Sequence, residues 1–241
     1  MHRPLRLGVL TPSSNTALEP LTSAIVAQLP DASAHFARFK VTEIALGANA
    51  LGQFDDSHIL AAAELLADAK VDVIGWSGTA AGWMGFDKDA LLVERIQQRT
   101  GIAATTAVLA LNELLELRNI QRLGIVSPYT ADVQERIIAN YQAAGIEVVA
   151  HTLENIRVNH AFAEIEPATL IQRIDEVCQA APQAVVTYCT NLRAAHLATE
   201  VEARHQIPLL DTVSTTVWGM LRAAGHDPAQ IQGWGELYGW A

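Results

Sequence analysis

The residue whose type and position most clearly could do chemistry is Cys189. It follows the short apolar run from Ala184 to Tyr188 and precedes Thr190-Asn191, residue types that cap helix starts. The pattern predicts a buried strand that leads into a helix N-terminus, the edge where open α/β sheets bind ligands and where N–H groups tune a thiol. The alternative is that Cys189 is a small buried hydrophobic residue, as most free cysteines are.

The elements that must position Cys189 occur twice in the chain. Arg6 to Pro12 and Arg122 to Pro128 match at an offset of 122 − 6 = 116, and each predicts a strand followed by a turn and a helix. Thr79 and Thr190 match at an offset of 190 − 79 = 111. Gly78 therefore stands opposite Cys189 in the repeat.

The matching elements predict an α/β fold of two pseudo-symmetric parallel-sheet half-domains of the flavodoxin-like kind, with the active site in the cleft between them. We expect a first half-domain over residues 1–117, a second over 118–224 and a C-terminal tail over 225–241. The further predicted pairs are strands 35–41 and 145–150, helices 57–69 and 167–180, strands 71–79 and 183–190, strands 101–104 and 206–210, and helices opened by Thr105-Thr106 and by Asp211-Thr212.

The tail carries Trp234, Tyr238 and Trp240 and has no counterpart in the first half. Aromatic residues of this kind predict packing across a domain or subunit surface, so a homo-oligomer is among the expected states.

The composition excludes several partner classes. Hydrophobic residues make up 50% of the 241 residues, and charged residues 17%, which is typical of a globular protein. The net charge of −10 and the scattered basic residues argue against nucleic acid and anionic membranes. The N-terminal residues match neither a signal peptide nor a membrane span, so we expect a cytoplasmic protein without disulfides, with Cys178 structural.

Motifs for bound groups are not found in the sequence. The eight histidines show no H-x-x-x-H pattern and no pairing with cysteine at metal spacing, so we expect no metal site. The sequence contains no G-x-G-x-x-G, G-x-x-x-x-G-K-[ST] or G-x-S-x-G, which argues against dinucleotide, nucleotide and serine-hydrolase chemistry. We expect no cofactor and a small dicarboxylate as ligand.

Three strand ends carry motifs of a known family. They read Pro12-Ser13-Ser14-Asn15-Thr16, Ser127-Pro128-Tyr129-Thr130-Ala131-Asp132-Val133 and Cys189-Thr190-Asn191-Leu192-Arg193. Over nearly its whole length the chain resembles the aspartate/glutamate racemase superfamily, and within it the branch of maleate cis-trans isomerases and arylmalonate decarboxylases. Racemases and maleate isomerases of this group carry one cysteine per half. The decarboxylases resemble this chain in having glycine at the first position and keeping only the second cysteine.

The resemblance implies a cofactor-independent decarboxylase of a substituted malonate-type dicarboxylate, in which Cys189 protonates the enediolate left by loss of CO2. Hydroxyl groups and N–H groups at helix starts would hold the negative charge. The candidate residues are catalytic Cys189, Tyr129 and Thr79 and substrate-binding Pro12, Ser13, Ser14, Asn15, Gly78, Ala80, Ser127, Thr190 and Asn191. An apolar pocket for the departing carboxylate could include Trp76, Trp83 or Val158.

Two departures from the decarboxylases concern the substrate. Ala80 stands where they have serine, and Ser13-Ser14-Asn15 resembles the isomerase branch and suits a small, polar diacid. The electrostatics of Cys189 also point two ways. A helix N-terminus lowers a thiol pKa and favours the thiolate, whereas a proton donor must stay protonated and a bound dianion favours that form.

Each candidate residue also has a structural explanation. Asn15, Thr190 and Asn191 are helix-capping types, Tyr129 could be a packed aromatic with its hydroxyl on water, and Gly78 could serve a positive φ or a close backbone approach. Two functional alternatives stay open as well. One is a maleate cis-trans isomerase or a racemase-like isomerase, and the other is a diacid-binding relative without turnover.

Overall fold

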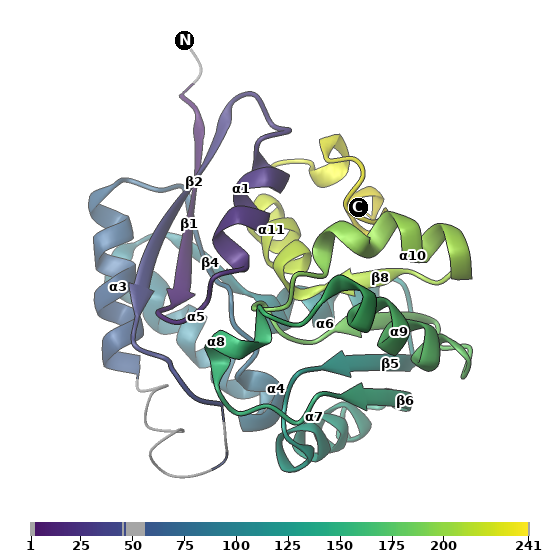
Figure 1. The fold of residues 1–241 in the computed structure, drawn as a ribbon. Helices are drawn as coiled ribbons and strands as arrows, with labels where there is room; N and C mark the ends of the chain where they lie inside the picture. The colour runs from purple at the N-terminus through teal and green to yellow at the C-terminus, as the bar shows by residue number, and fades with distance from the viewer. Residues whose placement is uncertain (1–2, 45, 47–55, 241) are drawn as a thin grey trace.

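The computed structural model describes residues 3–44, 46 and 56–240. Within these residues the strands form two four-stranded parallel sheets, with the orders β2-β1-β3-β4 and β6-β5-β7-β8. The identical strand order in the two halves is the structural form of the sequence repeat. The α/β class, with two parallel-sheet halves, is therefore as predicted (Figure 1).

The first half runs from β1 to α6. Its strands alternate with helices that cover the sheet, as the alternating apolar patterns predict. Its elements are β1 (Leu5–Pro12), α1 (Leu18–Val26), β2 (Ala32–Phe39), α3 (Asp56–Asp68), β3 (Val73–Trp76), α4 (Ala81–Met84), α5 (Phe86–Thr100), β4 (Ala103–Thr106) and α6 (Ala107–Leu117).

The second half repeats this order and ends in short helical turns. Its elements are β5 (Arg122–Ser127), α7 (Ala131–Ala143), β6 (Glu147–Leu153), α8 (Asn159–Phe162), α9 (Pro167–Cys178), β7 (Ala184–Thr187), the 3₁₀ turn η2 (Ala195–Leu197), α10 (Ala198–His205), β8 (Leu209–Asp211), α11 (Thr212–Ala223) and the 3₁₀ turns η3 (Pro228–Gln230) and η4 (Glu236–Gly239).

Helix α11 joins the halves. All residues from Thr212 to Leu221 are buried, and the helix packs against α6, α1 and β4 of the first half. Asp211 caps this helix by accepting hydrogen bonds from the backbone N–H groups of Val213 and Ser214, and Thr106 caps α6 by accepting from that of Leu109. Both helix starts lie where the sequence predicts them.

The expected helix start directly after Cys189 is wrong. Residues 190–194 form a turn, and α10 begins only at Ala198. The side chains of Thr190 and Asn191 make hydrogen bonds to other segments, to the carbonyl oxygens of Ser77 at 3.0 Å and of Asn159 at 2.6 Å. These contacts hold the segment as a connecting turn instead of a helix.

The tail packs on the body of the molecule. The indole N–H of Trp218 in α11 donates to the carbonyl oxygen of Trp240 at 3.0 Å. The hydroxyl of Tyr238 donates to the carbonyl oxygen of Ser214 at 3.2 Å. The domain boundaries at residues 117/118 and 224/225 stay predictions. Within the described residues, no helix is long and apolar enough to cross a membrane.

Candidate active site

The carboxyl ends of β1, β3, β5 and β7 border one small cavity of about 20 Å³ between the halves. Parallel strands present their carboxyl ends at one edge of a sheet, so both halves direct the segments that follow their strands to the same cleft. The residues that line it are Pro12, Val41, Ile44, Trp76, Gly78, Thr79, Ala80, Trp83, Tyr129, Asn159, Cys189 and Thr190. None of these described lining residues carries a charged side chain.

Two hydrogen bonds to threonine hydroxyls connect the halves across the cleft. Thr79 after β3 and Tyr129 after β5 share a hydrogen bond of 2.7 Å between their side-chain oxygens. Asn15 after β1 donates from Nδ2 to Oγ1 of Thr190 after β7, at 3.3 Å. In each case a loop of one half bonds the threonine of the other half, so the repeat builds the cleft symmetrically.

Cys189 is a buried thiol with 3% of its surface exposed. The backbone N–H of Asn191 donates to its sulfur at 3.4 Å, and the Tyr129 hydroxyl is a further hydrogen-bond partner. Burial raises the pKa of Cys189 to about 12, against the lowering effect of the Tyr129 hydroxyl and of backbone N–H groups. The expected lowering by a helix N-terminus is outweighed because the thiol is desolvated and a turn follows it. Cys189 is therefore protonated at neutral pH.

Tyr129 is held as a neutral hydrogen-bonding group. Its ring packs edge-on against Trp83 and Phe162, at centroid distances of 5.3 and 5.6 Å. Burial, followed by the charge of a Cys189 thiolate, raises the pKa of Tyr129 well above its usual range. The ring is packed, and the hydroxyl has a protein partner, because it makes a hydrogen bond with Thr79. The site thus holds a thiol and two hydroxyl groups that all stay neutral.

Gly78 makes room for an aromatic ring. Its φ lies outside the left-handed region, so backbone conformation does not require glycine here. A Cβ at this position would lie 2.1 to 2.5 Å from three atoms of the Trp76 indole. The close approach of a side chain therefore explains the glycine.

Five predicted site residues lie outside the cavity wall: Ser13, Ser14, Asn15, Ser127 and Asn191. Asn15 caps the start of α1, with its Oδ1 accepting from the N–H groups of Ala17 and Leu18. Asn191 Oδ1 accepts from the N–H groups of Thr16 and Ala17, across the interface between the halves.

The serines make structural contacts. Ser14 Oγ donates to the carbonyl oxygen of Val41 at 2.5 Å, and the exposed Ser13 also bonds the backbone of Val41. Ser127 Oγ donates to Oε1 of the buried Gln134 in α7 at 2.6 Å. These groups hold the loops that carry the lining residues.

Sequence reasoning missed three lining residues. Val41 and Ile44 follow β2, and the carboxyl end of that predicted strand was the available signal. Asn159 donates from Nδ2 to Ser14 Oγ at 2.8 Å and begins α8, a helix of four residues that is too short for a periodic signal. Of the three candidates for an apolar pocket, Trp76 and Trp83 line the cavity, whereas Val158 is 57% exposed and lies outside it.

A buried carboxyl lies near the thiol. Asp211 accepts from the Thr187 hydroxyl at 2.7 Å, and burial raises its pKa to about 6. Its negative charge contributes to the raised pKa of Cys189. The described residues contain no group of three or more His, Cys, Asp or Glu that could hold a metal ion.

Comparison with known proteins shows what the whole chain is similar to. The family model of arylmalonate decarboxylase matches residues 20–238. A maleate isomerase of Pseudomonas putida is 28% identical over 251 residues, covering 96% of either chain. An arylmalonate decarboxylase of Bordetella bronchiseptica is 25% identical over 169 residues, covering 69% of this chain and 70% of that protein.

Solved structures show the same fold. A cysteine-to-alanine variant of the maleate isomerase Iso from Pseudomonas putida S16, with maleate, superposes with a TM-score of 0.90 at 25% identity and covers 98% of each chain. A crystal structure of arylmalonate decarboxylase superposes with a TM-score of 0.80 at 22% identity, covering 98% of this chain and 100% of that one. The relatives thus include both isomerases and decarboxylases.

Proposed function

The chain belongs to the arylmalonate decarboxylase family, and from that premise we propose that it decarboxylates a malonate-type dicarboxylate without a cofactor. In this proposal Cys189 delivers the proton that replaces the lost carboxylate, while Thr79 and Tyr129 stabilise the intermediate. The matched relatives include both decarboxylases and isomerases. Our proposal is that this chain catalyses the first of these two reactions.

The arrangement of Cys189 and Gly78 carries the proposal. Cys189 is a buried, protonated thiol on one wall of the cleft. The equivalent position on the other wall is Gly78, whose face is covered by the Trp76 indole. A site with one thiol can protonate one face of a carbanion, whereas a two-base reaction needs an acid or base on both faces.

The chemistry proceeds in two steps. Loss of CO2 leaves the electron pair of the broken C–C bond on the remaining fragment as an enediolate. The Thr79 and Tyr129 hydroxyls, together with backbone N–H groups near Ala80 and Thr190, donate hydrogen bonds to its oxygens. The Cys189 S–H then transfers its proton to carbon and becomes a thiolate. Solvent returns a proton to the sulfur before the next turnover.

The uncharged lining supports loss of CO2. The described wall contains Trp76, Trp83, Val41 and Ile44 beside its few polar groups. A carboxylate placed against the apolar part loses hydration without gaining an ionic partner, which favours its departure as neutral CO2. The remaining carboxylate is held by neutral donors, whose hydrogen bonds strengthen as charge moves onto its oxygens.

A maleate-type isomerase is the second candidate, and the comparisons favour it over the decarboxylase. The maleate isomerase relative matches more of the chain than the decarboxylase relative does, at slightly higher identity. For this reaction Cys189 alone would have to add to the double bond and leave after rotation, since Gly78 offers no thiol. Addition requires a thiolate, which the raised pKa of Cys189 disfavours at neutral pH.

The test is a parallel assay of both reactions. CO2 release from methylmalonate and phenylmalonate and conversion of maleate to fumarate, each followed by NMR, are measured with the parent protein and with Cys189→Ala. The proposal predicts CO2 release that the variant loses. Maleate conversion without CO2 release would contradict it and support the isomerase. Binding of these diacids without any turnover would support a binding protein.

A further inference from the structure

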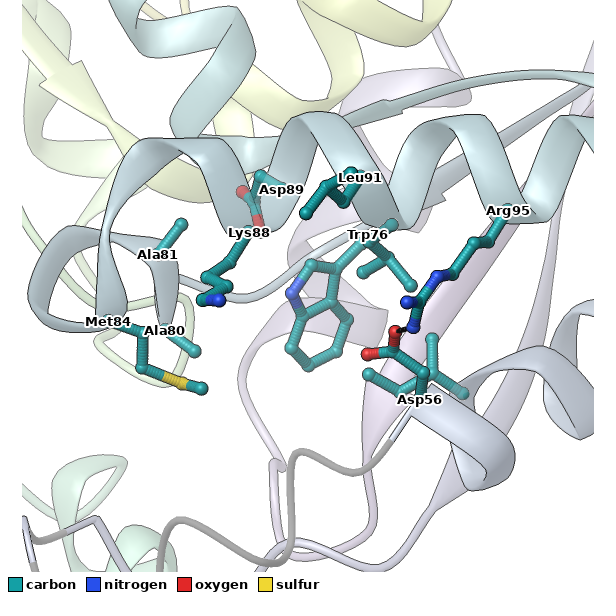
Figure 2. Close-up of a pocket in the computed structure, with 11 residues that line it drawn as sticks. Asp56, Trp76, Ala80, Ala81, Met84, Lys88, Asp89, Leu91 and Arg95 are labelled. Carbon is teal, nitrogen blue, oxygen red and sulfur yellow. Dashed lines mark hydrogen bonds and ion pairs between the residues drawn. The ribbon is translucent and has the colours of Figure 1, made fainter.

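A second cavity lies beside the candidate active site. It has a volume of about 350 Å³ and is bordered by α3, α4 and α5 (Figure 2). Its apolar wall includes Ile59, Met84, Leu91 and Leu92. Arg95 at one end forms an ion pair with Asp56, which cancels much of its charge. Lys88 and Asp89 also line this side pocket. Its size and its four apolar side chains suit an aryl group.

Trp76 separates the side pocket from the cleft. Among the described residues, Trp76 and Ala80 line both cavities. The indole is 2% exposed, and its ring centroid lies 5.0 Å from that of Phe39. Figure 2 shows it in the middle of the side pocket, between Lys88 and Met84 at one end and the Asp56–Arg95 pair at the other. The Phe39 ring packs against the indole between the two spaces.

The same indole covers Gly78, where three of its ring atoms lie within 2.5 Å of the place of a Cβ. A side chain at position 78 therefore needs the indole to shift. The indole thus lies between the cavity of about 20 Å³ in the cleft and the side pocket of about 350 Å³, and it lines both.

Resting on the proposed function, we propose that Trp76 is the residue that determines substrate size. It limits the enzyme to short diacids, such as malonates whose side group is hydrogen or methyl, and it excludes aryl side groups from the adjoining pocket. Replacement of the indole by a smaller side chain opens the side pocket to an aryl group. The substrate class is thus a short-chain dicarboxylate.

The experiment compares methylmalonate with phenylmalonate in the parent protein and in Trp76→Leu. The expected result is a rise of about tenfold or more in the ratio of kcat/KM for phenylmalonate to that for methylmalonate, the scale of discrimination that an apolar pocket gives. Leu91→Trp on the wall of the side pocket should cancel this gain when added to Trp76→Leu. Leu65→Trp, on the exposed face of α3, is the matched control and should not change it.

A binding measurement separates this inference from the proposed function. Calorimetry with phenylmalonate and with methylmalonate compares Cys189→Ala with the double variant Cys189→Ala/Trp76→Leu, since turnover plays no part in either variant. Tighter phenylmalonate binding in the double variant supports the inference even if the parent is not a decarboxylase. An unchanged preference, or a parent that accepts phenylmalonate as well as methylmalonate, overturns it. Failure of every variant to bind either diacid overturns both proposals.

Discussion

The two halves build the same frame around different groups. After β3 the chain reads Gly78-Thr79, and after β7 it reads Cys189-Thr190. Both threonines make a hydrogen bond across the cleft: Thr79 shares one with the Tyr129 hydroxyl, and Thr190 accepts one from Asn15. The frame is therefore symmetric, whereas one wall presents a thiol and the other an indole over a glycine. The difference indicates that the repeat positions groups and that single residues decide the reaction.

The largest expected effect comes from removing the Cys189 thiol, which has only Gly78 as its counterpart on the other wall. Cys189→Ala should lower kcat for decarboxylation by about 10²- to 10⁴-fold, the usual contribution of a positioned proton donor. Cys189→Ser is the matched control, because it keeps the size but is a much weaker acid, and it should lie close to Cys189→Ala. Steady-state CO2 release measures both. Parental activity in Cys189→Ala would show that Cys189 takes no part in the reaction.

The hydroxyl pair comes next. Tyr129→Phe and Thr79→Val each remove one donor with little change of volume, and each should lower kcat by about 10²- to 10³-fold. The matched control is Tyr141→Phe, whose hydroxyl bonds Asn112 and Tyr188 away from the cleft. Melting temperatures confirm that the variants are folded. An equal loss of kcat in Tyr129→Phe and Tyr141→Phe would show that the Tyr129 hydroxyl has no specific part in the reaction.

The pH profile distinguishes a thiol from a thiolate. The pKa of Cys189 is raised to about 12, so the proton-donating form is complete at pH 7 and is lost only as the pH approaches 12. The decarboxylation rate should therefore be level between about pH 7 and 10. A reaction through the thiolate would instead rise close to tenfold per pH unit in this range. Initial rates in overlapping buffers decide between the two.

The glycine side of the pair should affect stability more than chemistry. Gly78→Ala places a methyl group against the indole, and overpacking of this kind costs about 1–3 kcal/mol. In the Trp76→Leu background the same substitution should cost less, since the clashing ring is gone. A double-mutant cycle of urea unfolding measures the coupling. Equal costs in both backgrounds would show that Trp76 does not occupy that space.

The smallest effect concerns the buried carboxyls that each half carries beside a threonine. Asp89 accepts from Thr106 at 2.5 Å, and Asp211 from Thr187 at 2.7 Å. Burial raises their pKa values from 3.8 to about 7 and about 6. The folded state thus holds protons that the unfolded state releases, so the free energy of unfolding should fall as pH rises from about 4 to about 7.

Asp89→Asn tests this pH dependence in the first half. The variant should flatten the decline in the free energy of unfolding, which is at most about 1.4 kcal/mol per pH unit for one group. Chemical denaturation at several pH values measures the slope. Asp175→Asn is the control, because that carboxylate is partly exposed and pairs with Arg204. A parent protein that becomes more stable between about pH 4 and 7 would contradict protonated carboxyls at these two positions.

Much of the fold could be predicted because its signals are local. The matching strand patterns at Arg6 and Arg122 predict the repeat, and capping residues predict the starts of α6 and α11. The start of α10 could not be found in this way. Thr190 and Asn191 look like caps in the sequence, but their partners are Ser77 and Asn159, more than 30 residues away in the chain.

The candidate site was predictable where chemistry follows a strand end. Cys189, Thr79 and Tyr129 meet at one cavity, as the repeat and the family motifs indicate. The role of Trp76 was not predictable in detail. Trp76 ends β3 and Gly78 follows in the loop, and the sequence gives no sign that the indole folds over the glycine Cα. The pKa of Cys189 depends on burial, which only the packing of both halves sets.

The most direct test of the account is decarboxylation of methylmalonate in D2O by the parent protein. A single thiol on one wall delivers deuterium to one face, so the account predicts 2-deuteriopropionate of one configuration, detected by NMR with a chiral shift reagent. Racemic 2-deuteriopropionate would contradict delivery from Cys189 alone. Conversion of maleate to fumarate with no CO2 release from methylmalonate would contradict the reaction itself.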